Sequence, residues 1–366
     1  MVNKLKVDKV FLILVILLTV VGFFIFSSAS LGLLARNGAS FESVAKSQSV
    51  GLMLGIVSFI IMSKINYKFL RKNAFYILFG AICINLLLFI PVLSFDHGGA
   101  SRWINLGFTT FQPSEFLKIA FIIYFAAWLS GLKEKVSTFK YGIVPYIVII
   151  SILGTLLLFQ SDTDTLVVIA STGIIMLFIA GGRIKHLLLL CLMGAVLLAS
   201  VIYFRPYVRQ RVMTFFNNQN DVKGAGYQIQ QSLIAIGSGG IVGRGFGQSI
   251  QKFNYLPEPI GDSIFAVGAE EFGFIGSIVL IFLFLAFFIK TMKISVRSPD
   301  YFGGLTAIGI AILILIESFM NISSMLGLIP LSGMPLLFVS HGGTALIITL
   351  AAVGIIANIS KYQTHQ

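Results

Sequence analysis

Ten apolar stretches, each about as long as a bilayer is thick, constrain the fold of this chain more than any other feature. A helix that crosses the hydrocarbon core needs about 20 mainly apolar residues. The chain of 366 residues is 57% hydrophobic and only 11% charged, far from the averages of soluble domains. We therefore predict an all-α integral membrane protein, with a single domain over residues 1–366. The ten predicted transmembrane helices lie near residues 10–32, 46–63, 73–95, 113–131, 141–159, 163–181, 186–204, 263–289, 301–325 and 337–359.

The basic residues predict how these helices are oriented. With the N-terminus inside, sixteen of the 26 Lys and Arg residues fall in inner loops and only three in short outer loops. Cytoplasmic loops carry such an excess of positive charge, whereas long loops count little in this rule. Both termini are therefore predicted to be cytoplasmic, and the long loop between helices seven and eight, about 205–262, extracellular. The net charge of +12 then reflects the inner loops and not a nucleic-acid partner.

Ionisable residues gather at the outer ends of the predicted helices. Asp262 opens helix eight, Asp162 and Asp164 occupy the short turn between helices five and six, and Glu115 lies in the first turn of helix four with Lys118 one turn deeper. A charge within the membrane is costly and is by default a functional-site hypothesis. The sequence therefore predicts a site on the outer face.

Each of these residues also has a structural interpretation. Asp262 could cap helix eight by accepting backbone N–H bonds. Glu115 and Lys118 could neutralise each other as an i, i+3 pair. Glu270 and Glu271, inside helix eight, could bond other helices of the bundle.

The long outer loop has two distinct parts. Arg205, Arg209 and Arg211 are interleaved with aromatic residues, a pattern typical of a helix lying at the lipid headgroups; such a helix could be a plain anchor or could bind phosphate. The glycine-rich run over 237–247 indicates flexibility, or close approach of backbone to a ligand.

Motifs along most of the chain resemble those of the SEDS proteins, the FtsW, RodA and SpoVE group. They are Arg102-Trp103-Ile104-Asn105-Leu106-Gly107, Gln112-Pro113-Ser114-Glu115 with Lys118, Tyr227-Gln228 with Gly239, Gly240 and Gly243, Leu256-Pro257-Glu258, Asp262, Glu270-Glu271, and Pro330, Gly333, Ser340, Gly342 and Gly343. The family has ten transmembrane helices, both termini inside and a large outer loop between helices seven and eight, in agreement with the topology predicted above.

The resemblance implies a peptidoglycan glycosyltransferase that polymerises lipid II at the outer face of the bacterial cytoplasmic membrane. In such a reaction a carboxylate accepts the proton of the attacking sugar hydroxyl and cationic groups stabilise the departing diphosphate. Asp262 matches the essential aspartate of the family, as general base or metal-assisted activator. Glu115 and Lys118 match its cavity pair, with Lys118 as the phosphate partner. The residues predicted to bind substrate are Arg102, Asp162, Arg209, Arg211, Glu258 and Glu270. A divalent cation, Mg²⁺ or Mn²⁺, fits beside Asp262 and Asp162, and no organic cofactor is expected.

The chain departs from the family pattern at three places. Asp162 is retained, but Thr163 and Asp164 stand where the family has leucine and glycine, and the extra acid could alter a local pKa or a metal site. His341 replaces a tyrosine and adds a titratable group, for which a structural role is the simpler interpretation. Leu337 replaces a proline.

Partners follow from the resemblance alone. Family members work with a class B penicillin-binding protein, a transpeptidase, and with divisome or elongasome membrane proteins. Ser27-Ser28-Ala29-Ser30 and the stretch over 297–303 favour the division branch (FtsW) over the elongation branch (RodA).

Two other functional classes remain open at the level of sequence. A flippase for lipid-linked precursors should depend on ionisable residues through the full membrane depth. Here Glu317 is the main additional deep acid, and the others favour the outer half. A non-catalytic scaffold that recruits a penicillin-binding protein would not need Asp262, Glu115 and Lys118, which this chain retains.

Overall fold

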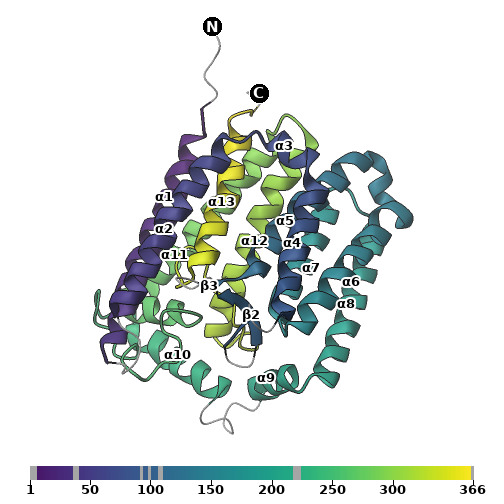
Figure 1. Ribbon diagram of the computed structural model, residues 1–366. Coiled ribbons are helices and arrows are strands. Elements are labelled where there is room, and N and C mark those ends of the chain that lie inside the picture. Colours follow the sequence, from purple (N-terminus) through teal and green to yellow (C-terminus); the bar gives the residue numbers. More distant parts are fainter. Residues whose placement is uncertain are drawn as a thin grey trace.

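The computed structural model describes residues 6–35, 41–90, 94–97, 100–105, 110–216 and 224–363. The described chain is a bundle of long helices with a small sheet at one end (Figure 1). The α-helices are α1 (Lys9–Ser30), α2 (Phe41–Lys64), α3 (Tyr67–Lys72), α4 (Ala74–Leu86), α5 (Pro113–Leu132), α6 (Val144–Phe159), α7 (Thr163–Ile179), α8 (Ile184–Phe204), α9 (Pro206–Phe216), α10 (Ala225–Gly239), α11 (Ile264–Val296), α12 (Tyr301–Met325) and α13 (Gly343–Ser360). Short 3₁₀ or π turns cover Leu31–Ala35, Leu87–Phe89, Lys133–Ser137 and Phe139–Ile143.

The predicted membrane helices are present as helices. Within the described residues, eight are long and apolar enough to cross a bilayer: Lys9–Leu34, Phe41–Lys64, Pro113–Leu132, Phe139–Phe159, Ile184–Phe204, Ile264–Val296, Tyr301–Met325 and Gly343–Ser360. Two shorter apolar helices, Ala74–Phe89 and Thr163–Ile179, occupy the third and sixth predicted positions. The predicted helical membrane fold is thus confirmed. The last helix begins later than predicted, because residues 337–342 form a non-helical segment.

The two ends of the bundle differ in what they carry. Figure 1 shows the start of α1, the end of α13 and α3 at one end, and α9, α10 and the strands at the other. The region predicted as a long outer loop therefore contains two helices, and residues 217–223 between them lie outside the described part.

A three-stranded antiparallel sheet corrects the all-α prediction. It is formed by β1 (Ser94–His97), β2 (Ala100–Asn105) and β3 (Thr110–Phe111), with Ile104 paired to both Ser94 and Phe111. Aromatic and β-branched residues such as Trp103 and Ile104 favour strands. The third predicted helix, 73–95, was too long at its end, because α4 ends at Leu86 and β1 begins at Ser94. Leu106 and Gly107 of the family motif lie outside the described residues.

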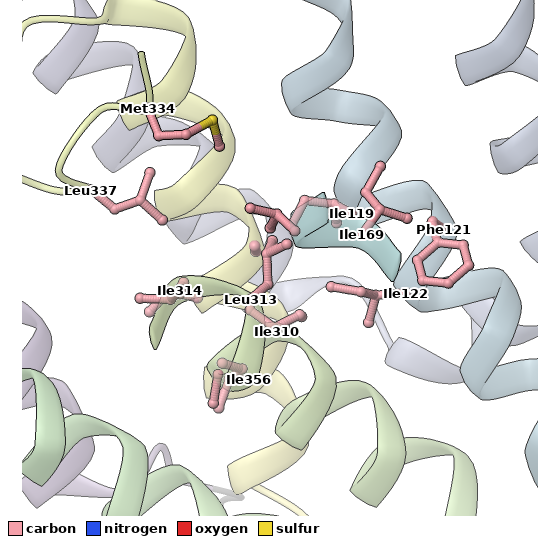
Figure 2. Packing of buried hydrophobic residues seen from close by; sticks show 14 of the residues in the cluster. Ile119, Phe121, Ile122, Ile169, Ile310, Leu313, Ile314, Met334, Leu337 and Ile356 are labelled. Carbon is pink, nitrogen blue, oxygen red and sulfur yellow. The ribbon is translucent and has the colours of Figure 1, made fainter. Parts of the chain in front are cut away.

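α12 is the central helix and positions the site. Most of its side chains are buried, in contact with α5, α7, α11 and α13, and Figure 2 shows Ile310 and Leu313 beside Ile119 and Ile122 of α5. Small residues permit this packing, as is usual between membrane helices: a methyl group on Gly309 would lie 2.8 Å from the Ile122 side chain. By contrast, α8 buries only Leu187 and Leu190.

α11 is broken at Gly273 (φ 65°, ψ −164°), and the glycine-rich run completes it. The amides of Arg244 and Gly245 donate to the carbonyls of Glu270 and Glu271 (3.0 and 2.9 Å), while Phe274 and Ile275 donate to the carbonyls of residues 240 and 241. Backbone polar groups within a membrane must be satisfied in this way. A methyl group at Gly243 would collide with the Glu271 carbonyl. The close approach at Gly243 is therefore to the backbone of α11.

Candidate functional site

Asp262 lies just before α11, with its carboxylate free of the helix. The N-cap residue of α11 is Ser263, and it makes no side-chain cap bond. Within the described residues, no donor hydrogen-bonds the Asp262 carboxylate, which is half-buried. Helix capping therefore does not account for this residue.

The backbone of Asp262 is fixed from α12. The side-chain amide of Asn321 donates to the carbonyl of Asp262 (2.7 Å) and to that of Met334 (2.8 Å). Ser340 Oγ donates to the neighbouring carbonyl of Gly261 at 2.8 Å. Three segments far apart in the sequence thus hold the peptide that carries the carboxylate.

Burial raises the pKa of Asp262 to about 7. The negative charge of Glu258 adds to this rise, Arg211 opposes it, Asp164 raises the pKa further, and Arg102 lowers it. A carboxyl that titrates near neutral pH can exchange a proton at physiological pH. The group therefore has the properties of a general base.

Two arginine–aspartate pairs flank Asp262. Arg211 Nη1 lies 3.0 Å from Asp164 Oδ2, and the guanidinium stacks over Tyr207 at 4.4 Å. The Asp164 carboxylate also accepts the amide of Gly333 at 3.3 Å. Asp164, where the family has glycine, is thus the partner of Arg211.

The second pair joins Arg102 to Asp162. Arg102 Nη1 lies 3.8 Å from Asp162 Oδ1, and Nη2 donates to the carbonyl of Ser161. Asp162 is also the N-cap of α7 and accepts from Thr165 Oγ1 at 2.9 Å. Arg102 and Asp162 remain predicted substrate-binding residues.

Glu115 and Lys118 form a buried cluster with a third residue that the sequence did not pair with them. Lys118 Nζ lies 2.9 Å from Glu115 Oε1 and 2.7 Å from Glu317 Oε2, and the three side chains are at most 3% exposed. Glu317 lies one turn from Asn321 on α12, so the cluster joins α5 to the helix that holds Asp262. The sequence signal for the contact between Lys118 and Glu317 was that each is an ionisable residue deep within an apolar helix.

Glu270 and Glu271 bind the loop that follows α10. Glu270 accepts from Ser249 Oγ (2.6 Å) and from the amides of residues 250 and 251, and Glu271 pairs with Lys252 at 2.7 Å. Ser28 of α1 joins this network through a 2.6 Å bond to Glu271. Both carboxylates thus stabilise the loop, while the substrate-binding role of Glu270 stays a prediction.

Two cavities lie on either side of α9. The first, about 240 Å³, lies against α10 and is lined by Tyr207, Gln210, Arg211, Thr214, Gly224, Ala225, Gln228 and Leu331. The second, about 350 Å³, lies against α8 and is lined by Ala199, Ile202, Tyr203, Arg209, Val212, Met213 and Phe216. A larger cavity of about 490 Å³ between α1, α2 and α13 is apolar and contains none of the predicted site residues.

His341 has structural contacts at the edge of the site. Its backbone amide donates to the carbonyl of Ile260 at 2.7 Å, and its ring stacks on Phe26 with centroids 5.8 Å apart. Burial lowers the pKa of His341. The ring is therefore neutral at physiological pH.

The carboxylates around Asp262 are few for a metal site made of protein ligands alone. The described residues contain no cluster of three or more His, Cys, Asp or Glu side chains that could hold a metal. Mg²⁺, however, is usually held by one or two carboxylates together with waters and phosphates. Asp262 and Glu258 can supply these carboxylates, whereas Asp162 is engaged with Arg102 and Thr165.

The predicted residues therefore fall into separate groups. Asp262, Glu258, Arg211 and Arg102 interact electrostatically at one place, together with Asp164. The other groups are the Lys118 cluster, the Glu270 network and Arg209 in the α8–α9 cavity. Residues not predicted for the site are Glu317, Asn321 and Lys252; the sequence contains no signal for Asn321 beyond its polarity within an apolar helix.

Comparisons with known proteins cover nearly the whole chain. The family model for FtsW, RodA and SpoVE, described as "Cell cycle protein", matches residues 8–365. Stage V sporulation protein E of Bacillus subtilis (strain 168) is 34% identical over 363 residues, covering 99% of both chains. The probable peptidoglycan glycosyltransferase FtsW of Geobacter sulfurreducens is 37% identical over 355 residues, covering 97% of this chain and 95% of that one.

Solved structures share the fold. The rod shape determining protein RodA of Thermus thermophilus aligns with a TM-score of 0.72 and 23% identity, covering 100% of both chains. A chain from the structure "Structural coordination of polymerization and crosslinking by a peptidoglycan synthase complex" aligns with a TM-score of 0.81 and 23% identity, covering 98% of this chain and 99% of that one. With a family model and relatives that span its length, the chain belongs to the FtsW, RodA and SpoVE family.

Proposed function

We propose that this protein is a peptidoglycan glycosyltransferase that polymerises lipid II into glycan strands. The observation that carries the proposal is the Asp262 carboxylate, which does not cap α11, has a pKa of about 7 and is flanked by Arg211. The relative from Geobacter sulfurreducens is named a probable peptidoglycan glycosyltransferase, which supports the same activity.

In the proposed reaction Asp262 is the general base. A sugar hydroxyl of one substrate attacks the anomeric carbon of the other, a new C–O bond forms, and the bond from that carbon to the diphosphate oxygen breaks. Asp262 accepts the hydroxyl proton, and the electron pair leaves with the diphosphate. Arg102 and Arg209 are the groups that we propose to stabilise the departing charge, whereas Arg211, which is already paired with Asp164, is proposed to bind substrate beside Asp262.

The α8–α9 cavity suits the diphosphate end of a lipid. Its lining is apolar except for Arg209 and the hydroxyl of Tyr203, and no carboxylate of the described residues pairs with Arg209. An unpaired cation above apolar side chains is complementary to a phosphate attached to a hydrocarbon chain.

We propose that Glu115 and Lys118 support the reaction by holding α5 against α12 through Glu317. One turn from Glu317 on α12, Asn321 holds the backbone of Asp262. Direct contact of Lys118 with phosphate remains the alternative role, since the family resemblance predicts it. A divalent cation, Mg²⁺ or Mn²⁺, held by Asp262 with Glu258 or Asp162, would neutralise charge on the diphosphate.

The proposed setting is the bacterial cytoplasmic membrane. We propose ten membrane helices, both termini in the cytoplasm, and the region over about 205–262, with Asp262, on the outer face. The two shorter apolar helices, α4 and α7, complete the ten. The excess of basic residues in the opposite loops supports this orientation.

A class B penicillin-binding protein is the proposed partner. A structural neighbour comes from a complex described as coordinating polymerisation and crosslinking. Relatives named FtsW and a sporulation protein support a division-type role, with divisome proteins as further partners.

The proposal is tested by reconstitution. The purified protein, supplied with lipid II, Mg²⁺ or Mn²⁺ and its transpeptidase, should form glycan polymer, and Asp262→Asn should abolish it. Glu42→Gln, the same chemical change at an exposed carboxylate of α2, is the matched control and should retain activity. Full polymerisation by a folded Asp262→Asn variant would refute the general base, and lipid II transfer across liposomes that does not need Asp262 would favour a flippase. Polymerisation that occurs with the transpeptidase alone would favour a scaffold.

A further inference from the structure

The α9–α10 cavity differs in chemistry from the cavity on the other side of α9. Its side chains include two carboxamides, Gln210 and Gln228, the hydroxyl of Thr214 and the ring of Tyr207. Its volume of about 240 Å³ is below the roughly 300–1,000 Å³ of pockets for drug-sized ligands. The cavity is therefore polar and suits one small ring.

The cavity has little net charge. Among the described residues that line it, Arg211 is the only cation, and that guanidinium is already paired with Asp164 at 3.0 Å. The described part of the lining contains no acidic side chain. A diphosphate would have to compete with the Asp164 carboxylate for Arg211, whereas carboxamides and a hydroxyl can bind hydroxyl and acetamido groups without such competition. A neutral sugar is the better match.

The cavity adjoins the catalytic carboxylate. Gln228 Nε2 donates to Ser263 Oγ at 2.9 Å, next to Asp262 in the chain. A methyl group placed on Gly333 would lie 3.6 Å from Asp262 Oδ2 and 3.7 Å from Arg211 Nη2. The Asp262 carboxylate and Arg211, which lines the cavity, therefore lie on two sides of the same position. A ring bound in this cavity can thus reach Asp262.

We propose that this cavity is the subsite for the N-acetylated sugar ring whose hydroxyl attacks. This inference rests on the proposed function and adds to it the place of the acceptor. The acceptor hydroxyl passes its proton to Asp262 as its oxygen bonds to the anomeric carbon of the donor. The donor diphosphate, which leaves with the electron pair of the broken bond, is bound elsewhere.

The test measures binding of methyl N-acetyl-β-glucosaminide to the full-length protein in detergent, without lipid substrate. Ala225→Leu fills the cavity, and Gln210→Ala removes an exposed carboxamide of the lining. Gln230→Ala, an exposed glutamine of α10 outside the lining, is the matched control. We expect Ala225→Leu to weaken binding at least tenfold, Gln210→Ala to weaken it several-fold, and Gln230→Ala to leave it unchanged.

Equal binding by the wild type and both cavity variants would overturn the proposal, as would displacement of the sugar by inorganic diphosphate. The steady-state rate of glycan synthesis separates this inference from the proposed function. A rise in the apparent KM for lipid II with Ala225→Leu supports the subsite. Unchanged kinetics of Ala225→Leu in an active enzyme refute the subsite but not the proposed function. Sugar binding with the expected variant pattern in a chain that makes no glycan would support the subsite and refute the proposed function.

Discussion

Replacing Asp262 by asparagine should stabilise the folded protein at pH 8. The pKa of this carboxyl rises from 3.8 to about 7 on folding, and each pKa unit corresponds to about 1.4 kcal/mol. The ionised carboxylate therefore costs the folded state up to about 4 kcal/mol. Because Asp262 is only half-buried, solvent screening lowers this figure, and we expect a gain of about 2 kcal/mol from the neutral amide.

The sign of the effect depends on pH. Between pH 3.8 and about 7 the folded state binds more protons at Asp262 than the unfolded state, so stability falls as pH rises through this window. Below about pH 4 the carboxyl becomes protonated in the unfolded state as well as in the folded state, and the advantage of asparagine should disappear.

The assay is unfolding in detergent at pH 4 and pH 8, with a chelator present so that a bound cation does not stabilise the wild type. Glu42→Gln, at a carboxylate exposed to solvent, should change the unfolding free energy by less than about 0.5 kcal/mol at either pH. If Asp262→Asn is no more stable than the wild type at pH 8, or gains equally at pH 4, then the carboxylate is not held at an elevated pKa, and the case for a general base fails.

Three further substitutions test the surrounding structure. Lys118→Met should destabilise the protein by about 3–5 kcal/mol in the same unfolding assay, because it leaves two buried carboxylates without their cation; an unchanged midpoint would contradict the buried cluster. Gly243→Ala should lower the unfolding midpoint strongly because its methyl group collides with α11, whereas Gly237→Ala, where the space is open, should not; equal effects would contradict the contact. Asp164→Asn should shift the acid limb of the pH–rate profile for glycan synthesis to lower pH, since it removes a negative charge that raises the pKa of Asp262 and frees Arg211 to lower it; an unmoved limb would separate Asp164 from the base.

The sequence predicted the membrane fold well because hydropathy is a local property. Each predicted helix needed only its own residues. Each of the ten stretches contains a helix in the structure, eight of them long and apolar enough to cross a bilayer, with boundary changes at 337–342 and in the third helix. The sheet was missed because strand pairing joins residues such as Ser94 and Ile104, whose contact no local pattern specifies.

The site was predictable in its residues but not in its pairings. Asp262 stood out as an acid beside a membrane helix, yet its neighbours come from α7, α9 and the segment before α13. The partner of Lys118 at i−3, Glu115, was evident from the sequence. Its second partner, Glu317, is 199 residues away, and no local pattern indicates that contact. Asn321 was missed for the same reason, since its bond to the Asp262 carbonyl depends on the packing of α12.

The break in α11 limits how the length of this chain can vary. Residues 240–245 pair with residues 270–275 in a fixed register, and the side chains of Ser249 and Lys252 contact Glu270 and Glu271. One inserted residue between Gly245 and Ser249 would keep the backbone pairing but displace the groups that neutralise two buried acids. Insertions and deletions should therefore be excluded from this short segment during evolution, although it lies at the surface of the bundle, where length usually varies freely.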